Sequence, residues 1–278
     1  MKRQFQKISL KRAIATAIVS VLTIPTWVIC ILISPTEATL VAQVNAIGFK
    51  LPPPPPDRDA PGRRGGGAGR GCGAGNQSIT ALMPEYQQAL ERGTITKVWG
   101  TTTTERPTFW FDIPYENGAI AAMEFVLQDN SSPAREIYRS AIVPPMAPGV
   151  ISIRLPASVP PLEGGKLYQW FFKVRLQCGS DLTAAKPQIQ KADLNGWVQR
   201  VSPSPTLTHQ LQQATPQQQA ALYAQNGIWF DALTTLAEQR LTHPQEAHLI
   251  ADWQTLLRSI GLEPLTTKSL IACCRSQP

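Results

Sequence analysis

The stretch LYQWFFKVRL, residues 167–176, alternates apolar and polar side chains and decides the fold class. Tyr168, Trp170, Phe172 and Val174 fall on one face of an extended chain, because successive side chains of a β-strand point to opposite sides. The stretch therefore predicts a strand with one face in the core.

The same period of two recurs between Ser78 and Val201, and Pro, Gly and Asn-Gly turn signals separate the runs. Six or seven such strands predict an antiparallel β-sandwich of immunoglobulin-like type over residues 78–203. We expect no parallel pairing, because no helical crossover of adequate length separates the strands. The other runs with strand periodicity lie at residues 109–113, 123–127, 135–143, 151–155 and 196–201.

From Thr206 the apolar residues follow the period of a helix. The sequence Thr215-Pro-Gln-Gln is a capping box with proline at the first helical position, which predicts a helix over 216–225. A second helix is expected from Ile228 to about Arg240, and a third from Thr242. The whole fold is predicted to be α+β, with a small helical hairpin over residues 204–278 packed on the sandwich.

Two aromatic residues, Trp110 and Phe171, occupy strand positions where alternation calls for polar side chains. Either these rings bind a ligand or another element covers their face, and we expect the helical tail to cover them. Together with Trp229 and Phe230 they form the candidate interaction surface predicted from the sequence.

The N-terminal residues 1–42 have the build of an export signal. Five basic residues precede an uncharged run over 13–33, and small residues follow at Thr36 and Ala38. A cleaved signal peptide is favoured over a retained membrane anchor, although 21 residues are enough to span a bilayer. In either case the rest of the chain is expected in the periplasm or outside the cell, with membrane contact only through an uncleaved N-terminal segment.

The surplus of positive charge lies outside the predicted folded part. The chain carries 26 Lys and Arg against 19 Asp and Glu, a net charge of +7. Residues 1–38 and 50–70 account for all of it, so that the sequence from Gly71 onward is neutral. Nucleic-acid binding is therefore disfavoured, because it needs basic residues concentrated on the folded surface.

Residues 43–77 combine a polyproline run at 52–56 with a Gly/Arg tract at 62–75. We expect a stiff polyproline II rod followed by a flexible coil, a disordered linker that contributes no side chain to the core.

Four cysteines remain outside the leader, and export to an oxidising compartment permits them to form disulfides. Cys273 and Cys274 are adjacent, so at least one of them is expected to bond to Cys72 or Cys178, with the connectivity left open. Zinc sites and redox pairs both favour Cys-x-x-Cys spacing, which does not occur. We expect no cofactor and no metal.

The sequence does not favour catalysis. None of His209, His243 and His248 belongs to a metal-binding motif, and no Gly-x-Ser-x-Gly elbow is present. Pairs of carboxylates that could hydrolyse glycosides come together only in a fold. The candidate carboxylates for such a pair are Glu116, Glu124, Asp129 and Glu136. The simplest interpretation is that they are solvated surface residues.

The helical tail resembles one tetratricopeptide unit and part of a second, over about 34 residues. The matching aromatic, small, bulky and proline positions are Tyr223, Ala232, Leu236 and Pro244, and Ala220 suits the small packing site. One unit cannot bury a continuous core by itself, so this resemblance also implies packing on the sandwich.

Six segments spread along the chain carry a second resemblance. They are LPPPPP from Leu51, RPTFWF from Arg106, EFVLQ from Glu124, PGVISIRLP from Pro148, GWVQRV from Gly196 and NGIWFDALTTL from Asn226. Together they are similar to a cyanobacterial family catalogued as a domain of unknown function, family 928. The resemblance implies an exported protein with this layout. It implies no catalytic or binding residues, since the family has no established activity.

Two functions from different classes follow. The first is a non-catalytic protein-interaction module of the cell envelope, which offers a sheet edge and a helical groove. The second is a module that binds carbohydrate or another envelope polymer by stacking sugars on exposed rings; a glycan-acting hydrolase is less favoured. Exposed, coplanar rings would favour the second, whereas buried rings beside an open groove would favour the first. The rings in question are Trp99, Trp110, Trp197 and Tyr168.

Overall fold

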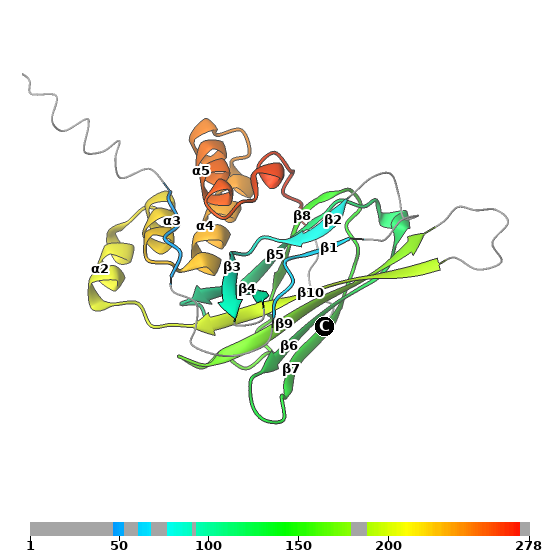
Figure 1. Cartoon of the computed structure of the whole chain (residues 1–278). Coiled ribbons are helices and arrows are strands. Elements are labelled where there is room, and N and C mark those ends of the chain that lie inside the picture. The colour runs from blue at the N-terminus through cyan, green and yellow to red at the C-terminus, as the bar shows by residue number, and fades with distance from the viewer. Residues whose placement is uncertain (1–46, 53–60, 68–76, 91–92, 179–187, 273–278) are drawn as a thin grey trace, which may run out of the picture.

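The computed structural model describes residues 47–52, 61–67, 77–90, 93–178 and 188–272. Within them it confirms the predicted α+β class, with two packed β-sheets followed by helices (Figure 1). The predicted leader lies outside the described residues. No helix in the described ranges is long and apolar enough to cross a bilayer.

The smaller sheet has four strands in the order β1-β2-β5-β8, and all of its pairs are antiparallel. Its strands are β1 (Gly65–Gly67), β2 (Ser78–Ala81), β5 (Thr108–Ile113) and β8 (Gly149–Arg154).

The larger sheet has six strands in the order β3-β4-β10-β9-β6-β7. One pair corrects the prediction that all pairing is antiparallel, because β10 runs parallel to β4 with Trp197 opposite Trp99. A parallel pair needs a long connection, and here strands β5 to β9 provide it instead of a single helix. The strands are β3 (Glu85–Leu90), β4 (Gly93–Thr102), β6 (Ile120–Asp129), β7 (Glu136–Ile142), β9 (Leu167–Cys178) and β10 (Gln188–Arg200).

The sandwich core is built from aromatic rings of both sheets. Phe111 of β5 stacks on Phe172 of β9, with ring centroids 4.2 Å apart, and Phe109 lies 4.8 Å from Phe125 of β6. Trp170, predicted to share the face of Phe172, is fully buried beside them. The period-two pattern therefore identified the inner face of β9 correctly.

Four helices follow the sandwich in the described chain. They are α2 (Pro205–Gln213), α3 (Pro216–Gln225), α4 (Trp229–Thr242) and α5 (Ala247–Arg258). The predicted capping box at Thr215 is present, with the side chains of Thr215 and Gln218 each bonded to the other's backbone N–H. The third predicted helix begins at Ala247 and not at Thr242, because α4 continues to Thr242 and a turn through His243 and Pro244 separates the two.

Helix α4 begins at the open end of the sandwich and continues over the outer face of the smaller sheet (Figure 1). At its start, Phe230 packs against Phe109 with centroids 5.2 Å apart, and the buried indole of Trp229 donates to the Leu82 carbonyl at 2.8 Å. One turn later, Thr234 accepts a hydrogen bond from Trp110 Nε1 at 3.0 Å. The sandwich and the helices consequently share one hydrophobic core.

Parts of the segment expected to be a disordered linker belong to the fold. Ile47 is fully buried, and Phe49 packs edge-on against Trp229 at 4.8 Å. Farther along, Gly62 lies so close to β4 that an added Cβ would stand 2.5 Å from the backbone nitrogen of Val98. A glycine-rich strand has no side-chain pattern to read, which is why the sequence did not predict β1.

Candidate functional site

A cleft of about 460 Å³ opens between α4 and the ends of strands β4, β5 and β8. Most of its lining residues carry hydroxyl groups or charges, and the apolar ones are Pro107, Leu155, Ala157 and Phe230. Its lining includes Thr102, Thr104, Arg106, Thr108, Arg154, Tyr223, Phe230, Asp231, Thr234, Thr235 and Glu238.

Asp231, in the first turn of α4, is the buried carboxylate of this cleft. Its Oδ2 accepts from Thr102 Oγ1 at 2.7 Å and from the backbone N–H of Thr103 at 3.1 Å. Its Oδ1 accepts from Thr103 Oγ1 at 2.5 Å and from Thr104 Oγ1 at 3.1 Å. Burial raises the pKa of Asp231 above its usual value, and the hydrogen bonds from the threonines oppose that rise.

These four hydrogen bonds define what Asp231 can do. An ionised carboxylate has about four lone-pair positions, and the threonine run supplies a donor to each. A general base needs a lone pair directed at its substrate, whereas these point into the β4–β5 turn. The geometry assigns Asp231 to joining α4 to that turn, at the end of the helix where its dipole favours negative charge.

The rim of the cleft carries charges of both signs. Arg154 of β8 pairs with Glu238 of α4 across the opening, and both side chains are largely exposed. Arg106 donates through Nε to the carbonyl of Val159 at 2.9 Å, which attaches the 156–166 loop to this side of the cleft. The rim can therefore offer both hydrogen-bond donors and acceptors to a polar ligand.

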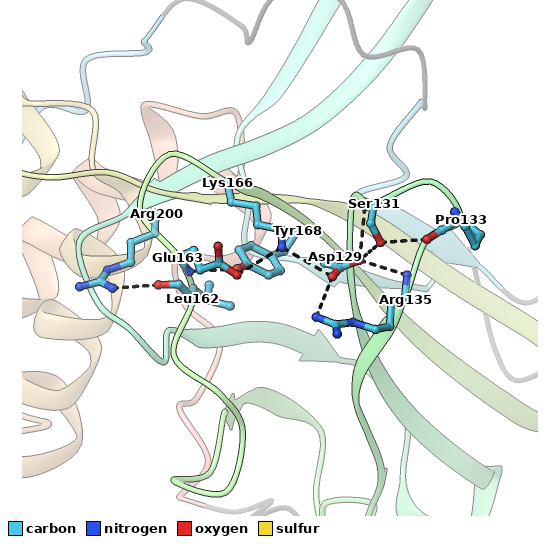
Figure 2. A network of polar contacts seen from close by, with 9 residues as sticks. All are labelled: Asp129, Ser131, Pro133, Arg135, Leu162, Glu163, Lys166, Tyr168 and Arg200. Atoms are coloured by element: carbon cyan, nitrogen blue, oxygen red, sulfur yellow. Dashed lines mark hydrogen bonds and ion pairs between the residues drawn. The ribbon is translucent and has the colours of Figure 1, made fainter.

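A second polar cluster holds the far end of the 156–166 loop (Figure 2). Asp129, at the end of β6, accepts from the Ser131 hydroxyl and from the Arg135 backbone N–H, and it pairs with Lys166 at 3.6 Å. The hydrogen bond from Ser131 is the main cause that lowers the pKa of Asp129 below its usual range. Like Asp231, this carboxylate is occupied by groups of its own chain, so we read the cluster as a brace for the loop.

The loop itself is fixed between Asp129 and the cleft (Figure 2). The Glu163 backbone N–H donates to Tyr168 Oη at 2.9 Å, and Arg200 donates to the Leu162 carbonyl at 2.8 Å. Arg200 also pairs with Glu105, next to Arg106, at 3.3 Å. The wall of the cleft is thus held at several points before any ligand binds.

The comparison with protein families agrees with the resemblance seen in the sequence. The model of a family described as Domain of Unknown Function (DUF928) matches residues 62–270, about three quarters of the chain. The chain belongs to the DUF928 family. The match contains both sheets and all four described helices, so the cleft lies within the family's common region. No curated protein matches the chain.

The interaction surface predicted for this DUF928 protein is not an exposed surface. Trp110, Trp229 and Phe230 are buried, with 4%, 0% and 2% of their surface exposed, because α4 packs them against the sandwich. Phe171 is half-buried on the outer face of the larger sheet. The prediction that helices cover Trp110 is confirmed by its bond to Thr234, whereas Phe171 lies on the other sheet.

The rings proposed to stack on sugars are also buried. Trp99, Trp110, Trp197 and Tyr168 are each 8% exposed or less. Tyr168 and Trp110 belong to the main core, and Trp99 and Trp197 form a second cluster with Tyr86.

The other candidate residues do not converge on a site. His209, His243 and His248 are exposed, and no group of three His, Cys, Asp or Glu in the described ranges could hold a metal ion. Arg139 pairs with both Glu124 and Glu136. The backbone of Cys178 ends β9, but its side chain lies outside the description, as do Cys72, Cys273 and Cys274.

Sequence reasoning missed the residues that shape the cleft. Four consecutive threonines at 101–104 and an aspartate in the first turn of a helix were visible signals. Nothing in the sequence joined them, because Thr102 and Asp231 are 129 positions apart.

Proposed function

We propose that this DUF928 protein is an exported, non-catalytic module that binds a partner protein in the cleft between α4 and the sandwich. The observation that carries the proposal is a contrast in the lining: the buried carboxylate is fully hydrogen-bonded within the chain, whereas the hydroxyls and charges nearer the rim line an open cleft. Such a lining supports recognition better than proton transfer.

The size and chemistry of the cleft suit an extended polypeptide segment. About 460 Å³ accommodates a few residues. Thr108, Thr234 and Thr235 offer hydroxyls that both donate and accept, which matches the alternating N–H and C=O groups of a peptide backbone. Arg154 and Glu238 add one charge of each sign for side-chain recognition.

The leader predicted from the sequence and the family resemblance support the location that we propose. We place the protein in a cyanobacterial envelope, in the periplasm or outside the cell, with an envelope protein as its partner. The contact between α3 and α4 supports the further proposal that they act as a single tetratricopeptide-like unit, with the sandwich in place of the neighbouring repeats. Sugar stacking loses its support, because the rings it needs are buried.

Site-specific photocrosslinking in the native envelope tests the proposal. A photoreactive residue at Thr235, in the cleft, should capture a defined polypeptide, and the same residue at Thr255, exposed on α5, should not. With the captured protein purified, Thr235→Arg should weaken binding at least tenfold, and Thr255→Arg should leave it unchanged. Equal capture at both positions, or capture of glycan alone, would contradict the proposal.

A further inference from the structure

Strand β8 is an edge strand of the smaller sheet, and its main chain is only partly paired on the side away from β5 (Figure 1). Near its start it pairs with a C-terminal strap, residues 269–271, which runs parallel to it. The Val150 N–H donates to the Ser269 carbonyl at 2.8 Å, and the Ile271 N–H donates to the Val150 carbonyl at 2.8 Å. The chain itself therefore extends this sheet by adding a short stretch to β8.

The same side of β8 continues beyond the strap. Alternate residues of a strand direct their N–H and C=O groups to the same side, so those of Ser152 and the N–H of Arg154 point the way those of Val150 do. Among the residues that the structure describes, none forms a hydrogen bond with these three groups, and the pairing with the strap ends at Ile271. This half of the edge is therefore a template for another strand.

The side chain of Arg154 is held on the outer face of the sheet. Its Nε donates to Thr108 Oγ1 of neighbouring β5 at 3.3 Å, and its guanidinium pairs with Glu238 of α4. Both partners lie on the far side of β8 from an added strand or on the helix that covers the outer face. Arg154 also lines the cleft, so the unpaired edge adjoins the rim of the proposed binding site.

We propose that the partner protein adds an extended segment to β8 at Ser152 and Arg154, next to the cleft. The proposal deepens the function proposed above and rests on it for the partner being a polypeptide. A polypeptide supplies N–H and C=O groups at the repeat of a strand, which is what successive outward main-chain groups require. The strap shows that this edge accepts a strand in that way.

The two faces of β8 define the kind of segment that fits. Ile151 and Ile153 point into the core and are fully buried, whereas Ser152 and Arg154 lie on the opposite face, beside Glu238 of α4. Neighbouring side chains on one face of a sheet contact each other across strands. The segment should alternate apolar residues next to the isoleucines with polar or charged residues on the other face. It should also lack proline where its N–H bonds to the Ser152 carbonyl.

Ser152→Pro removes the central donor of this edge. Because the Ser152 N–H points away from β5, proline at this position costs the sheet no hydrogen bond, and edge strands tolerate proline in that orientation. Ser152→Ala is the matched control, because it removes the hydroxyl and keeps the N–H. The indole of Trp229, bonded to the Leu82 carbonyl, serves as the NMR reference for an intact fold in both variants.

The probes are synthetic heptapeptides selected from a random displayed library against the full-length chain. They should bind the wild type and Ser152→Ala alike, and Ser152→Pro at least tenfold more weakly. Methylation of single peptide N–H groups should weaken binding only at alternate positions, a pattern that also tests the proposal if Ser152→Pro does not fold. Equal binding to all three proteins, no alternation in the methylation series, or a library without binders would overturn the proposal.

Thr235→Arg, in the cleft, separates failure of this proposal from failure of the proposed function. Peptides that are weakened by Thr235→Arg but bind Ser152→Ala and Ser152→Pro equally would leave the cleft as the binding site and overturn strand addition. Peptides that are weakened by Ser152→Pro alone would support strand addition and contradict binding in the cleft.

The amide proton of Ser152 tests whether the edge is open before the peptide binds. In the full-length chain alone it should exchange with solvent as an unpaired amide does, and a selected peptide should slow that exchange at least tenfold. Slow exchange without peptide that persists on dilution would show that the chain's own residues occupy the edge, and slow exchange that is lost on dilution would indicate a second copy. Either result would overturn the proposal.

Discussion

Replacing Asp231 by alanine should loosen helix α4 from the sandwich. Four hydrogen bonds to a carboxylate would be worth several kcal/mol if they were added up. Two effects reduce that sum. Burial already disfavours the charge, and Thr103 is partly exposed and Thr104 exposed, so that water can replace the carboxylate at both. Only the hydroxyl proton of Thr102, a residue with no exposed surface, is left without an acceptor, so we expect a loss of about 3 kcal/mol in the free energy of unfolding.

Urea unfolding of the wild type and three variants measures this loss. With a slope of about 3 kcal/mol per molar urea, Asp231→Ala should lower the unfolding midpoint by about 1 M. Thr102→Val should lower the unfolding free energy by about 2 kcal/mol, because its hydroxyl also accepts from the Thr104 N–H at 3.0 Å. Thr104→Val is the matched control, with an expected change of about 0.5 kcal/mol or less, because its side chain is exposed. Equal losses of unfolding free energy in Thr102→Val and Thr104→Val, or no loss in Asp231→Ala, would refute the proposal that these hydrogen bonds hold α4 to the sandwich.

Three more outcomes follow from buried groups. Burial raises the pKa of Asp112 from 3.8 to about 6. Between pH 4 and 6 the folded state therefore holds a proton that the unfolded state has released. The free energy of unfolding should fall by up to about 3 kcal/mol over this range as the pH rises. Asp112→Asn should flatten that slope in urea unfolding measured at several pH values; an unchanged slope would contradict the assignment. Gly196→Ala should lower thermal stability by several degrees, because its Cβ would stand 2.5 Å from the ring of Trp170, and a neutral result would mean that the ring moves freely. Trp229→Phe should cost about 3 kcal/mol in urea unfolding, since it leaves the Leu82 carbonyl unpaired and opens a cavity; a change below about 1 kcal/mol would count against it.

Local patterns predicted the elements well. The alternation around Trp170 located the inner face of β9, and the capping box at Thr215 gave the start of α3. Both signals lie within a few neighbouring residues, where backbone geometry fixes which side chains meet. The break in alternation at Trp110 even indicated that a helix covers the smaller sheet.

Contacts between distant segments could not be read in the same way. The threonine run and Asp231 meet only because α4 returns to the end of β4. The pairing of β4 with β10 joins strands that are far apart in the chain, and the Gly-rich strand β1 has no side chains that form a pattern. Surface predictions failed for a related reason, because a large ring signals an apolar neighbour without saying whether that neighbour is another protein or the same chain.

The pairing of β4 with β10 also sets an order of events for a nascent chain. Trp99 leaves the ribosome, or a translocation channel, about 100 residues before its partner Trp197. During that interval the β3–β4 hairpin has an unsatisfied edge that could recruit a strand from another molecule. Contacts between such distant segments also slow folding. A chaperone that shields this hairpin until β10 emerges would therefore raise the yield of folded protein more than one that acts on the helices.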